Sequence, residues 1–441
     1  MNNQYNCIVM GAAGRDFHVF LSFLKGNEHF RVKAFTATQI PFITERIFPK
    51  SLAGPGYEED IPIYDESELP GLIKKLDIDF VFFAYSDISH ADLMHKSSIV
   101  QAAGASFIIA GPEHTQLVSD KPVVSVTATR TGAGKSPLTQ YLARLLTDQG
   151  KKVAVIRHPM PYGNLEMQAV QRFATPEDLD FHKCTIEERE EYAPYVDMGI
   201  PIYAGVDYQG ILDESSKEAD IVLWDGGNND FSFIKPDLDI VVVDALRAGH
   251  EIDYFPGEVN FRRADVLVIG KAKSAEPGAV EGIRERAEAM NPDAVIVTAD
   301  LEIDIDKPEL IRGNKVLVIE DGPTVTHGGM AFGAGSVAAR RYGATAVAPR
   351  KYAVGTIAGT YDAYPHMKFI LPAMGYSDDQ RKDLTDTINA CAEAEGIACV
   401  VDASPARLDR MLELDVPMAR VTYRFKQLDG TPLEDRVQEL L

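Results

Sequence analysis

A short glycine-containing loop has the residue types that hold phosphate groups. The segment 129–136 reads TRTGAGKS, follows the apolar run 123–128 and precedes apolar residues at helical spacing as far as Leu146. Backbone N–H groups in such a turn and at a helix N-terminus lack intrahelical partners, so they can face an anion. Lys135 adds a positive charge for the β- and γ-phosphates, and the Ser136 hydroxyl can ligate Mg²⁺. The segment is therefore predicted to bind a nucleotide.

This loop departs from the usual G-x-x-x-x-G-K-[ST] pattern at its first position, where Thr129 stands in place of glycine. Gly132 can supply the backbone freedom that the turn requires. The residues expected to contact the nucleotide are Thr131, Gly132, Ala133, Gly134, Lys135, Ser136, Pro137 and, further along the chain, Lys271.

A second apolar run, 221–224, ends in Asp225. An acidic residue at the end of a strand near a phosphate loop completes the shell of a bound Mg²⁺, usually through water. Ser136 and Asp225 are therefore the expected metal-binding residues. Polar residues follow at the strand end, where ligands bind in open α/β sheets. These substrate candidates are Asn228, Asn229 and Asp230.

Arginine and histidine side chains follow several expected strands. Arg157 and His158 end one strand, and Arg247 and His250 come after another. The carboxyl ends of parallel strands meet at one edge, and arginine pairs bidentately with phosphate, so the pattern favours a polyanionic substrate. Solvated charges on polar loops are the open alternative. The expected catalytic residues are Lys135, Asp225, Arg130, Arg157 and Arg247, with His158 and His250 as substrate contacts.

Three further segments carry weaker signals. The first apolar run is followed by 11-GAAGRDFH-18, in which Gly14 and Arg15 are candidate anion contacts, although a plain βα turn is equally compatible. At 267–275 a GTPase would carry Asn-Lys-x-Asp, but Lys273 occupies the Asp position, which favours ATP over GTP. The glycines of 320–344, with His327 and the pair Arg340-Arg341, fit an anion-binding turn or a solvated loop.

The elements that must position these residues alternate between strands and helices, as in α/β proteins. Continuous apolar runs are typical of buried parallel strands. We expect strands at 5–10, 31–37, 79–87, 106–112, 123–128, 152–158, 220–226, 239–246, 264–272, 294–300, 315–320, 344–350, 366–374, 397–403 and 416–425. We expect helices at 68–76, 91–103 and 378–396, and an acidic helical stretch at 175–192.

The predicted fold class is α/β with three domains: a Rossmann-like doubly wound unit over 1–120, a P-loop NTPase domain with a mainly parallel sheet over 121–324, and an α/β block over 325–441.

Composition narrows the class of protein. The 441 residues carry a net charge of −22, which argues against general nucleic-acid binding. No apolar run reaches the roughly 18 residues that a membrane span needs, and the N-terminus does not resemble a signal peptide. The four cysteines are scattered without a C-x-x-C pair, as in reduced cytosolic thiols. We expect a cytoplasmic protein, with a homodimer as the expected assembly.

Taken together, these segments resemble the cyclic 2,3-diphosphoglycerate synthetase family. The resemblance rests on GAAGRDFH at 11–18, TRTGAGKS at 129–136, VIRHPMPYG at 155–163, YAGVDY at 203–208, LWDGGNNDF at 223–231, RAGHE at 247–251, PGEVN at 256–260 and EDGPTVTHGGM at 320–330. It implies an ATP-dependent ligase that closes 2,3-diphosphoglycerate into an intramolecular phosphoanhydride or activates a related small anionic phosphorylated acid, with Mg²⁺ expected from the residues above. The P-loop part also resembles dethiobiotin synthetase.

Two other classes of function remain open. A P-loop GTPase or ATPase could act as a switch or as a metal-loading maturation factor on a partner protein, although Lys273 counts against GTP. A dinucleotide-dependent oxidoreductase could use the N-terminal unit, although the G-x-G-x-x-G pattern is incomplete there.

Overall fold

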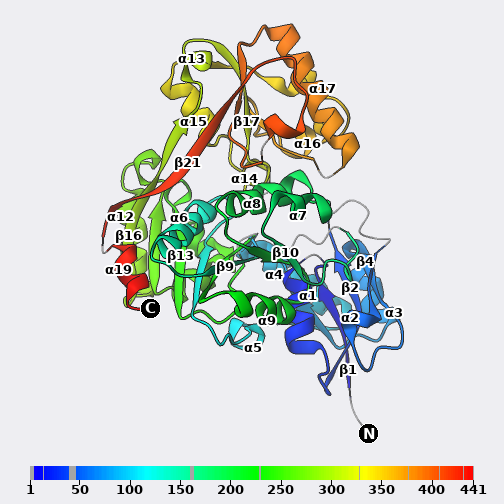
Figure 1. Ribbon diagram of the computed structural model, residues 1–441. Helices are drawn as coiled ribbons and strands as arrows, with labels where there is room; N and C mark the ends of the chain where they lie inside the picture. Colours follow the sequence, from blue (N-terminus) through cyan, green and yellow to red (C-terminus); the bar gives the residue numbers. More distant parts are fainter. Residues whose placement is uncertain are drawn as a thin grey trace.

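The computed structural model describes residues 4–12, 14–38, 46–158, 163–227, 230–326, 328–375, 377–406, 408–430 and 432–440. The chain is an α/β protein built on two large, mostly parallel sheets (Figure 1). The N-terminal part lies at the lower right of Figure 1, the phosphate-loop part at the lower left, and the C-terminal part above them.

The N-terminal sheet has six strands in the order β3-β4-β2-β1-β5-β7, and all neighbours are parallel except β3 and β4. The strands are β1 (Tyr5–Met10), β2 (Phe30–Ala37), β3 (Ile47–Phe48), β4 (Ile61–Asp65), β5 (Phe80–Phe83) and β7 (Ser106–Ile109). The helices include α1 (Arg15–Val19), α3 (Leu69–Lys75) and α4 (His90–Ala103). Alternation of strand and helix is therefore confirmed here, with β5 and β7 shorter than expected.

The second sheet begins with eight strands in the order β10-β11-β9-β12-β8-β13-β15-β16. These are β8 (Val123–Ala128), β9 (Val153–Arg157), β10 (Gln171–Phe173), β11 (Ile202–Ala204), β12 (Ile221–Asp225), β13 (Leu238–Asp244), β15 (Val266–Gly270) and β16 (Val295–Ile305). Every residue of β8 is buried, and β12 and β13 flank it on both sides in the sheet. The loop after β8 thus emerges between Asp225 at the end of β12 and Asp244 at the end of β13.

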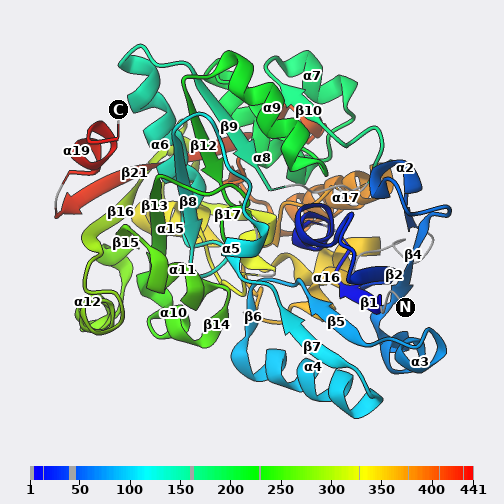
Figure 2. The same cartoon turned by 90° about the horizontal axis from the view of Figure 1, so that it is seen from below.

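A long antiparallel ribbon extends this sheet into the C-terminal part. Strand β16, expected to end near residue 300, continues to Ile305 and pairs with β21 (Met418–Asp429). Beyond β21 lie β20 (Cys399–Asp402), β17 (Lys315–Glu320), β18 (Thr345–Ala346) and β19 (Leu371–Pro372). The chain then returns to the phosphate-loop part, where α19 (Leu433–Gln438) buries Leu433 and Val437 in the core. Figure 1 shows β21 running between the two parts, and Figure 2 shows it from below, near β16.

Helix α8 (Ile186–Asp197) joins the same two parts through its side chains. The acidic stretch 175–192 forms two helices, α7 (Pro176–Phe181) and α8, each opened by a threonine capping box. Ile186 at the start of α8 belongs to the C-terminal hydrophobic core, whereas Tyr192 and Tyr195 belong to the core beneath the phosphate loop. Residues in the middle of α8 therefore lie between the two cores.

The C-terminal strands are shorter than the sequence suggests. The expected strand 366–374 is reduced to two residues, because Pro372 has no N–H to donate to a sheet. Strand β18 is also two residues long, and Pro349 opens a short 3₁₀ turn just beyond it. The expected helix at 378–396 is confirmed as α17 (Asp378–Glu395), which Ser377 caps and Gly396 ends with φ +60°. Other helices of this part include α15 (Ala334–Arg341), α16 (Gly355–Ala363) and the single turns α13 (Pro308–Ile311), α14 (Gly322–Val325) and α18 (Leu408–Met411).

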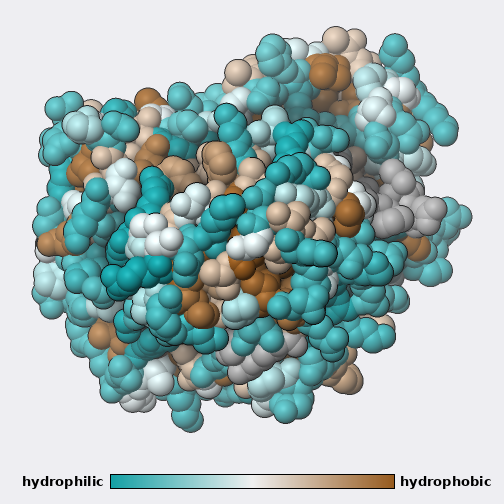
Figure 3. Space-filling model, turned by 90° about the horizontal axis from the view of Figure 1, so that it is seen from above, coloured by the Kyte–Doolittle hydropathy of each residue, from teal (hydrophilic) through white to brown (hydrophobic). Residues whose placement is uncertain are grey.

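Hydrophilic side chains cover most of the face seen in Figure 3, and hydrophobic residues gather there only in small patches. Among the described residues, none of the helices combines the length and the apolar character that a bilayer crossing requires.

Candidate active site

The loop after β8 has the backbone of a phosphate-binding turn. Gly132 and Gly134 adopt positive φ angles of +75° and +108°, which favour glycine, and Gly134 caps helix α6 (Lys135–Asp148). Thr129 is not among the residues with positive φ, so glycine is not required there. Its N–H donates to the Val242 carbonyl at 3.0 Å, which anchors the start of the loop to β13.

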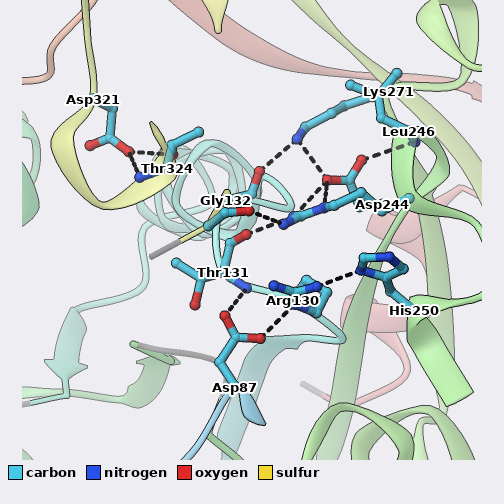
Figure 4. Close-up of polar contacts among 12 residues, drawn as sticks. Asp87, Arg130, Thr131, Gly132, Asp244, Leu246, His250, Lys271, Asp321 and Thr324 are labelled. Carbon is cyan, nitrogen blue, oxygen red and sulfur yellow. Dashed lines mark hydrogen bonds and ion pairs between the residues drawn. The ribbon is translucent and has the colours of Figure 1, made fainter. Parts of the chain in front are cut away.

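Two cations hold the loop from the β13 side (Figure 4). Lys271 Nζ donates to the Gly132 carbonyl at 2.6 Å and pairs with Asp244 Oδ2 at 3.0 Å. Arg247 Nη2 donates to the Thr131 carbonyl at 2.6 Å and pairs with the same carboxylate at 2.7 Å. Both residues were predicted to contact ligands, and the structure places their charged ends on the loop carbonyls. They therefore fix the loop's shape.

Arg130 ties the loop to the N-terminal part. Its Nε donates to Asp87 Oδ1 at 2.7 Å, and its Nη1 contacts His250 Nδ1. The guanidinium also stacks over Tyr254, 3.6 Å from the ring centroid. Figure 4 shows Arg130 held between Asp87 and His250. Arg130 and His250, two predicted site residues, thus lie together at the boundary between the two parts.

On the β12 side, Asp225 is the centre of a buried network. Its Oδ1 pairs with Arg157 Nη1 at 2.8 Å and accepts from Thr139 at 3.2 Å. Its Oδ2 accepts from the Tyr195 hydroxyl at 2.7 Å. Arg157 also pairs with Glu191 and lies 3.5 Å from the Ser136 hydroxyl. Burial alone would lower the pKa of Arg157, but Asp225 and Glu191 outweigh burial and raise it. Arg157 therefore stays charged beside the loop.

A pocket of about 310 Å³ opens in front of the loop, between the phosphate-loop part and the C-terminal part. This volume is in the range that holds a small ligand or a cofactor. Lys135 lines the pocket, and burial followed by the charge of Arg157 lowers its pKa to about 8. The other predicted residues that line it are Thr131, Gly132, Gly134, Ser136, Pro137, Arg157 and Lys271.

The far wall of the pocket was missed from the sequence. It contains Glu190 and Glu191 of α8, Asp321 after β17, and Tyr423 of β21. These residues are far apart in the chain, and helix α8 together with the β16–β21 ribbon brings them together. A run of glutamates in an acidic helix looks like a solvated face, so no pattern in the sequence distinguishes Glu190.

Four other predicted residues form a separate cluster beneath the N-terminal loop. His158 Nε2 pairs with Asp230 Oδ2 at 2.8 Å, and Arg15 Nη1 lies 3.9 Å from Asp230 Oδ1. A Cβ added to Gly14 would meet the His158 ring at 2.4 Å, so glycine is needed for this approach. Arg15, Asp230 and His158 are all buried, and none of the four residues lines the pocket.

The remaining predictions concern residues 228–229 and the segment 320–344, of which Gly333 and Arg341 line the pocket. Asn228, Asn229 and His327 lie outside the described residues. The helix that follows the 320–333 segment is capped by the protein itself, because Glu320 accepts from the N–H groups of Gly333, Gly335 and Ser336. An external anion would have to displace this carboxylate. Among the residues that the structure places, no group of three metal-ligating side chains is present.

Comparisons with known proteins place the chain in a family. No family model matches it. It is 53% identical to "Arginine synthetase ArcE" of Thermococcus kodakarensis over 98% of this chain and 96% of the relative. It is 23% identical to "Cyclic 2,3-diphosphoglycerate synthetase" of Rubrobacter xylanophilus over 54% of this chain and 58% of the relative.

Among solved structures, LpxK of Aquifex aeolicus aligns with 74% of this chain and 89% of its own, at 15% identity and a TM-score of 0.42. The high identity to one relative over nearly the whole of both chains decides the assignment, whereas the family resembled by the sequence segments is more distant. The chain is an enzyme, and it belongs to the family of the arginine synthetase ArcE.

Proposed function

We propose that this chain is an ATP-dependent synthetase that forms arginine. The observation that carries the proposal is the 53% identity to an arginine synthetase over nearly the whole of both chains. The pocket supports it, because a phosphate-binding loop with Lys135 and Ser136 faces carboxylates on the opposite wall. Such a site suits a phosphate donor on one side and a cationic nitrogen compound on the other.

The chemistry follows from the product. Arginine differs from its ureido analogue, citrulline, by a nitrogen in place of the ureido oxygen. That oxygen is a poor leaving group, so it would first attack the γ-phosphorus of ATP, and the bond to ADP would break. Ammonia would then attack the ureido carbon, and the C–O bond would break to release inorganic phosphate. Starting from ammonium, the products are arginine, ADP, phosphate and one proton.

The residues around the loop have matching roles in this proposal. Lys135 and the loop N–H groups would hold the β- and γ-phosphates, and Arg157 would stabilise charge on the transferred group. Ser136, which lines the pocket, would supply a hydroxyl ligand to Mg²⁺, and the ion would neutralise phosphate charge. Asp225 is fully buried and does not line the pocket, so it could reach such an ion only through water. Lys273, at the position where a GTPase would carry the Asp of Asn-Lys-x-Asp, favours ATP over GTP.

Ring closure of 2,3-diphosphoglycerate is the second candidate. It is favoured by the weaker likeness over about half of the chain. A polyanionic substrate would have to lie against Glu190 and Asp321, which form no ion pair with the described residues, and negative charges there would repel it. The acidic wall therefore weighs against this candidate.

The test is to incubate the protein with ATP, Mg²⁺, citrulline and ¹⁵N-ammonium and to identify the products. The proposal requires arginine with one ¹⁵N in its guanidinium group, formed together with equal amounts of ADP and phosphate. Cyclic product from 2,3-diphosphoglycerate, with no arginine from citrulline, would favour the second candidate. ATP hydrolysis that neither substrate couples to a product would overturn both.

A further inference from the structure

Two carboxyl groups in the pocket, Glu190 and Asp321, lie close to each other. Burial raises the pKa of Glu190 well above its ordinary value, and the neighbouring charge of Asp321 raises it further. Asp321 uses one oxygen to cap α14 (Gly322–Val325), accepting from the Thr324 N–H at 3.1 Å (Figure 4). Two adjacent carboxyl groups cannot both ionise unaided, so the pair must hold either a proton or a cation.

The environment of Glu190 indicates a missing ligand. Its side chain is 4% exposed, and its Oε1 accepts from the Ser404 hydroxyl at 2.7 Å. Its Oε2 receives no hydrogen bond from any residue that the structure describes. Neither Glu190 nor Asp321 forms an ion pair within the described part of the chain, whereas the adjacent Glu191 is neutralised by Arg157. A buried acceptor without a donor is costly, and a bound donor would relieve that cost.

The position of the pair selects the kind of ligand. Both carboxyl groups line the pocket that contains Lys135 and Ser136, so the ligand shares this pocket with the transferred phosphate. Glu191 and Lys135 interact electrostatically, which places this part of α8 beside the loop lysine. A cation with several N–H donors would satisfy both carboxyl groups and would also reduce their repulsion of the phosphates.

We propose that Glu190 and Asp321 form the binding site for the ammonium ion that supplies the new nitrogen, and that Glu190 removes its proton. This inference rests on the proposed function. An N–H of ammonium would donate to Glu190 Oε2, and another would donate to the Asp321 oxygen that does not cap α14, in place of the contact between the two carboxyl groups. One N–H bond would break, the proton would move to Glu190, and the freed lone pair would attack the activated ureido carbon. The later release of this proton to solvent completes the balance.

The first test compares Glu190→Gln with Glu187→Gln. Glu187 is a matched control, because it lies on the same helix, is similarly buried, also leaves Oε2 without a hydrogen bond and does not line the pocket. Loss of a charged hydrogen-bond acceptor predicts that Glu190→Gln raises KM for ammonium about 10- to 100-fold. KM for citrulline should change less than about twofold, and Glu187→Gln should resemble the wild type in both constants.

Two outcomes would overturn the assignment. A rise in KM for citrulline alone would place the amino group of that substrate at Glu190, and equal effects of both variants would reduce Glu190 to a structural role. Absence of arginine formation in the wild type is a different result, because it removes the proposed function before either variant is compared.

A second test needs no turnover. Rb⁺ is close to ammonium in size and scatters X-rays anomalously, so crystals of the full chain can be soaked in rubidium chloride. An anomalous peak between Glu190 and Asp321, present in Glu187→Gln and lost in Glu190→Gln, is the expected result. A wild-type map with no peak at this position would contradict a cation site there, whatever reaction the enzyme performs.

Discussion

The two walls of the pocket differ in whether their charged side chains form ion pairs within the protein. On the phosphate-loop side, three arginines lie next to the loop, and each is already paired with carboxylates. The pairs are Arg130 with Asp87, Arg157 with Asp225 and Glu191, and Arg247 with Asp244. On the opposite wall, Glu190 and Asp321 form no ion pair with the residues that the structure describes.

We infer from this difference that the paired charges stabilise the structure of the site, whereas the carboxyl groups without a counter-ion bind a ligand. The paired arginines hold backbone carbonyls and strand ends in place, so their first effect is on the shape of the loop. Glu190 and Asp321 accept hydrogen bonds from Ser404 and Thr324 but form no ion pair with the described residues, so burial of their charge is unfavourable without a bound cation. Variants on the two walls should therefore fail in different ways.

The largest effect should come from breaking the buried pair at the end of β9. Arg157→Met leaves Asp225 without its closest cation, which should lower the free energy of unfolding by about 3–5 kcal/mol. Urea denaturation measures this change. The control is Arg172→Met, which breaks the exposed pair with Glu218 and should cost less than about 1 kcal/mol. Similar losses in the two variants would contradict a structural role for the Arg157 network.

Lys135→Ala, on the same wall, should lower turnover without lowering the stability of the fold. Loss of a charge aimed at the transferred phosphate predicts a fall of about 10²–10³-fold in kcat for ATP-dependent product formation. Denaturation midpoints should stay near that of the wild type, because burial disfavours the charged form of Lys135. A variant that keeps normal turnover would show that Lys135 does not serve the transferred phosphate.

Lys271→Met should weaken ATP binding, which is a smaller effect than the loss of turnover in Lys135→Ala. It removes the hydrogen bond to the Gly132 carbonyl but leaves Asp244 paired with Arg247. The loop should then be less well ordered, and Kd for ATP should rise about tenfold. Calorimetry measures Kd, and Lys273→Met, at an exposed position on the pocket rim, should change it less than about twofold. A larger rise in Kd for Lys273→Met than for Lys271→Met would show that the lysine at the rim matters more for ATP binding.

The pH dependence should be the mildest effect. The folded protein lowers the pKa of Lys135 from 10.5 to about 8, so between these values it binds fewer protons there than the unfolded chain does. The contribution of Lys135 to the free energy of unfolding therefore increases as the pH rises from about 8 to 10.5. Bound phosphates favour the charged form, so ATP binding above pH 8 should take up a proton and weaken as pH rises.

Calorimetry in buffers of different ionisation enthalpy measures this proton uptake. It should be present at pH 8.5 in the wild type and lost in Lys135→Met. Uptake that persists in the variant would assign the proton to another group.

The sequence predicted the parts of the site that depend on local pattern. The apolar run before Thr129, the glycines and Lys135 lie in adjacent positions, so the strand, turn and helix could be read directly. The strand end at Asp225 follows the same logic. These features needed no knowledge of which strands become neighbours.

The opposite wall could not be predicted in this way. Glu190 and Asp321 belong to different elements and meet only because α8 packs into the C-terminal core and β16 extends to pair with β21. Likewise, the arginines were expected to reach a ligand because charge alone is visible in a sequence. Asp87 becomes a neighbour of Arg130 only in three dimensions, whereas Asp244 lies three residues before Arg247 and was already close to it in the sequence.

The most direct measurement follows the fate of one oxygen atom. Citrulline labelled with ¹⁸O at the ureido position would be converted with ATP, Mg²⁺ and ammonium, and the released phosphate would be analysed by mass spectrometry. The account predicts one ¹⁸O in each inorganic phosphate, because the γ-phosphoryl group is transferred to the ureido oxygen. Arginine formed with unlabelled phosphate would contradict it, because the phosphate would then have come from hydrolysis of ATP by water.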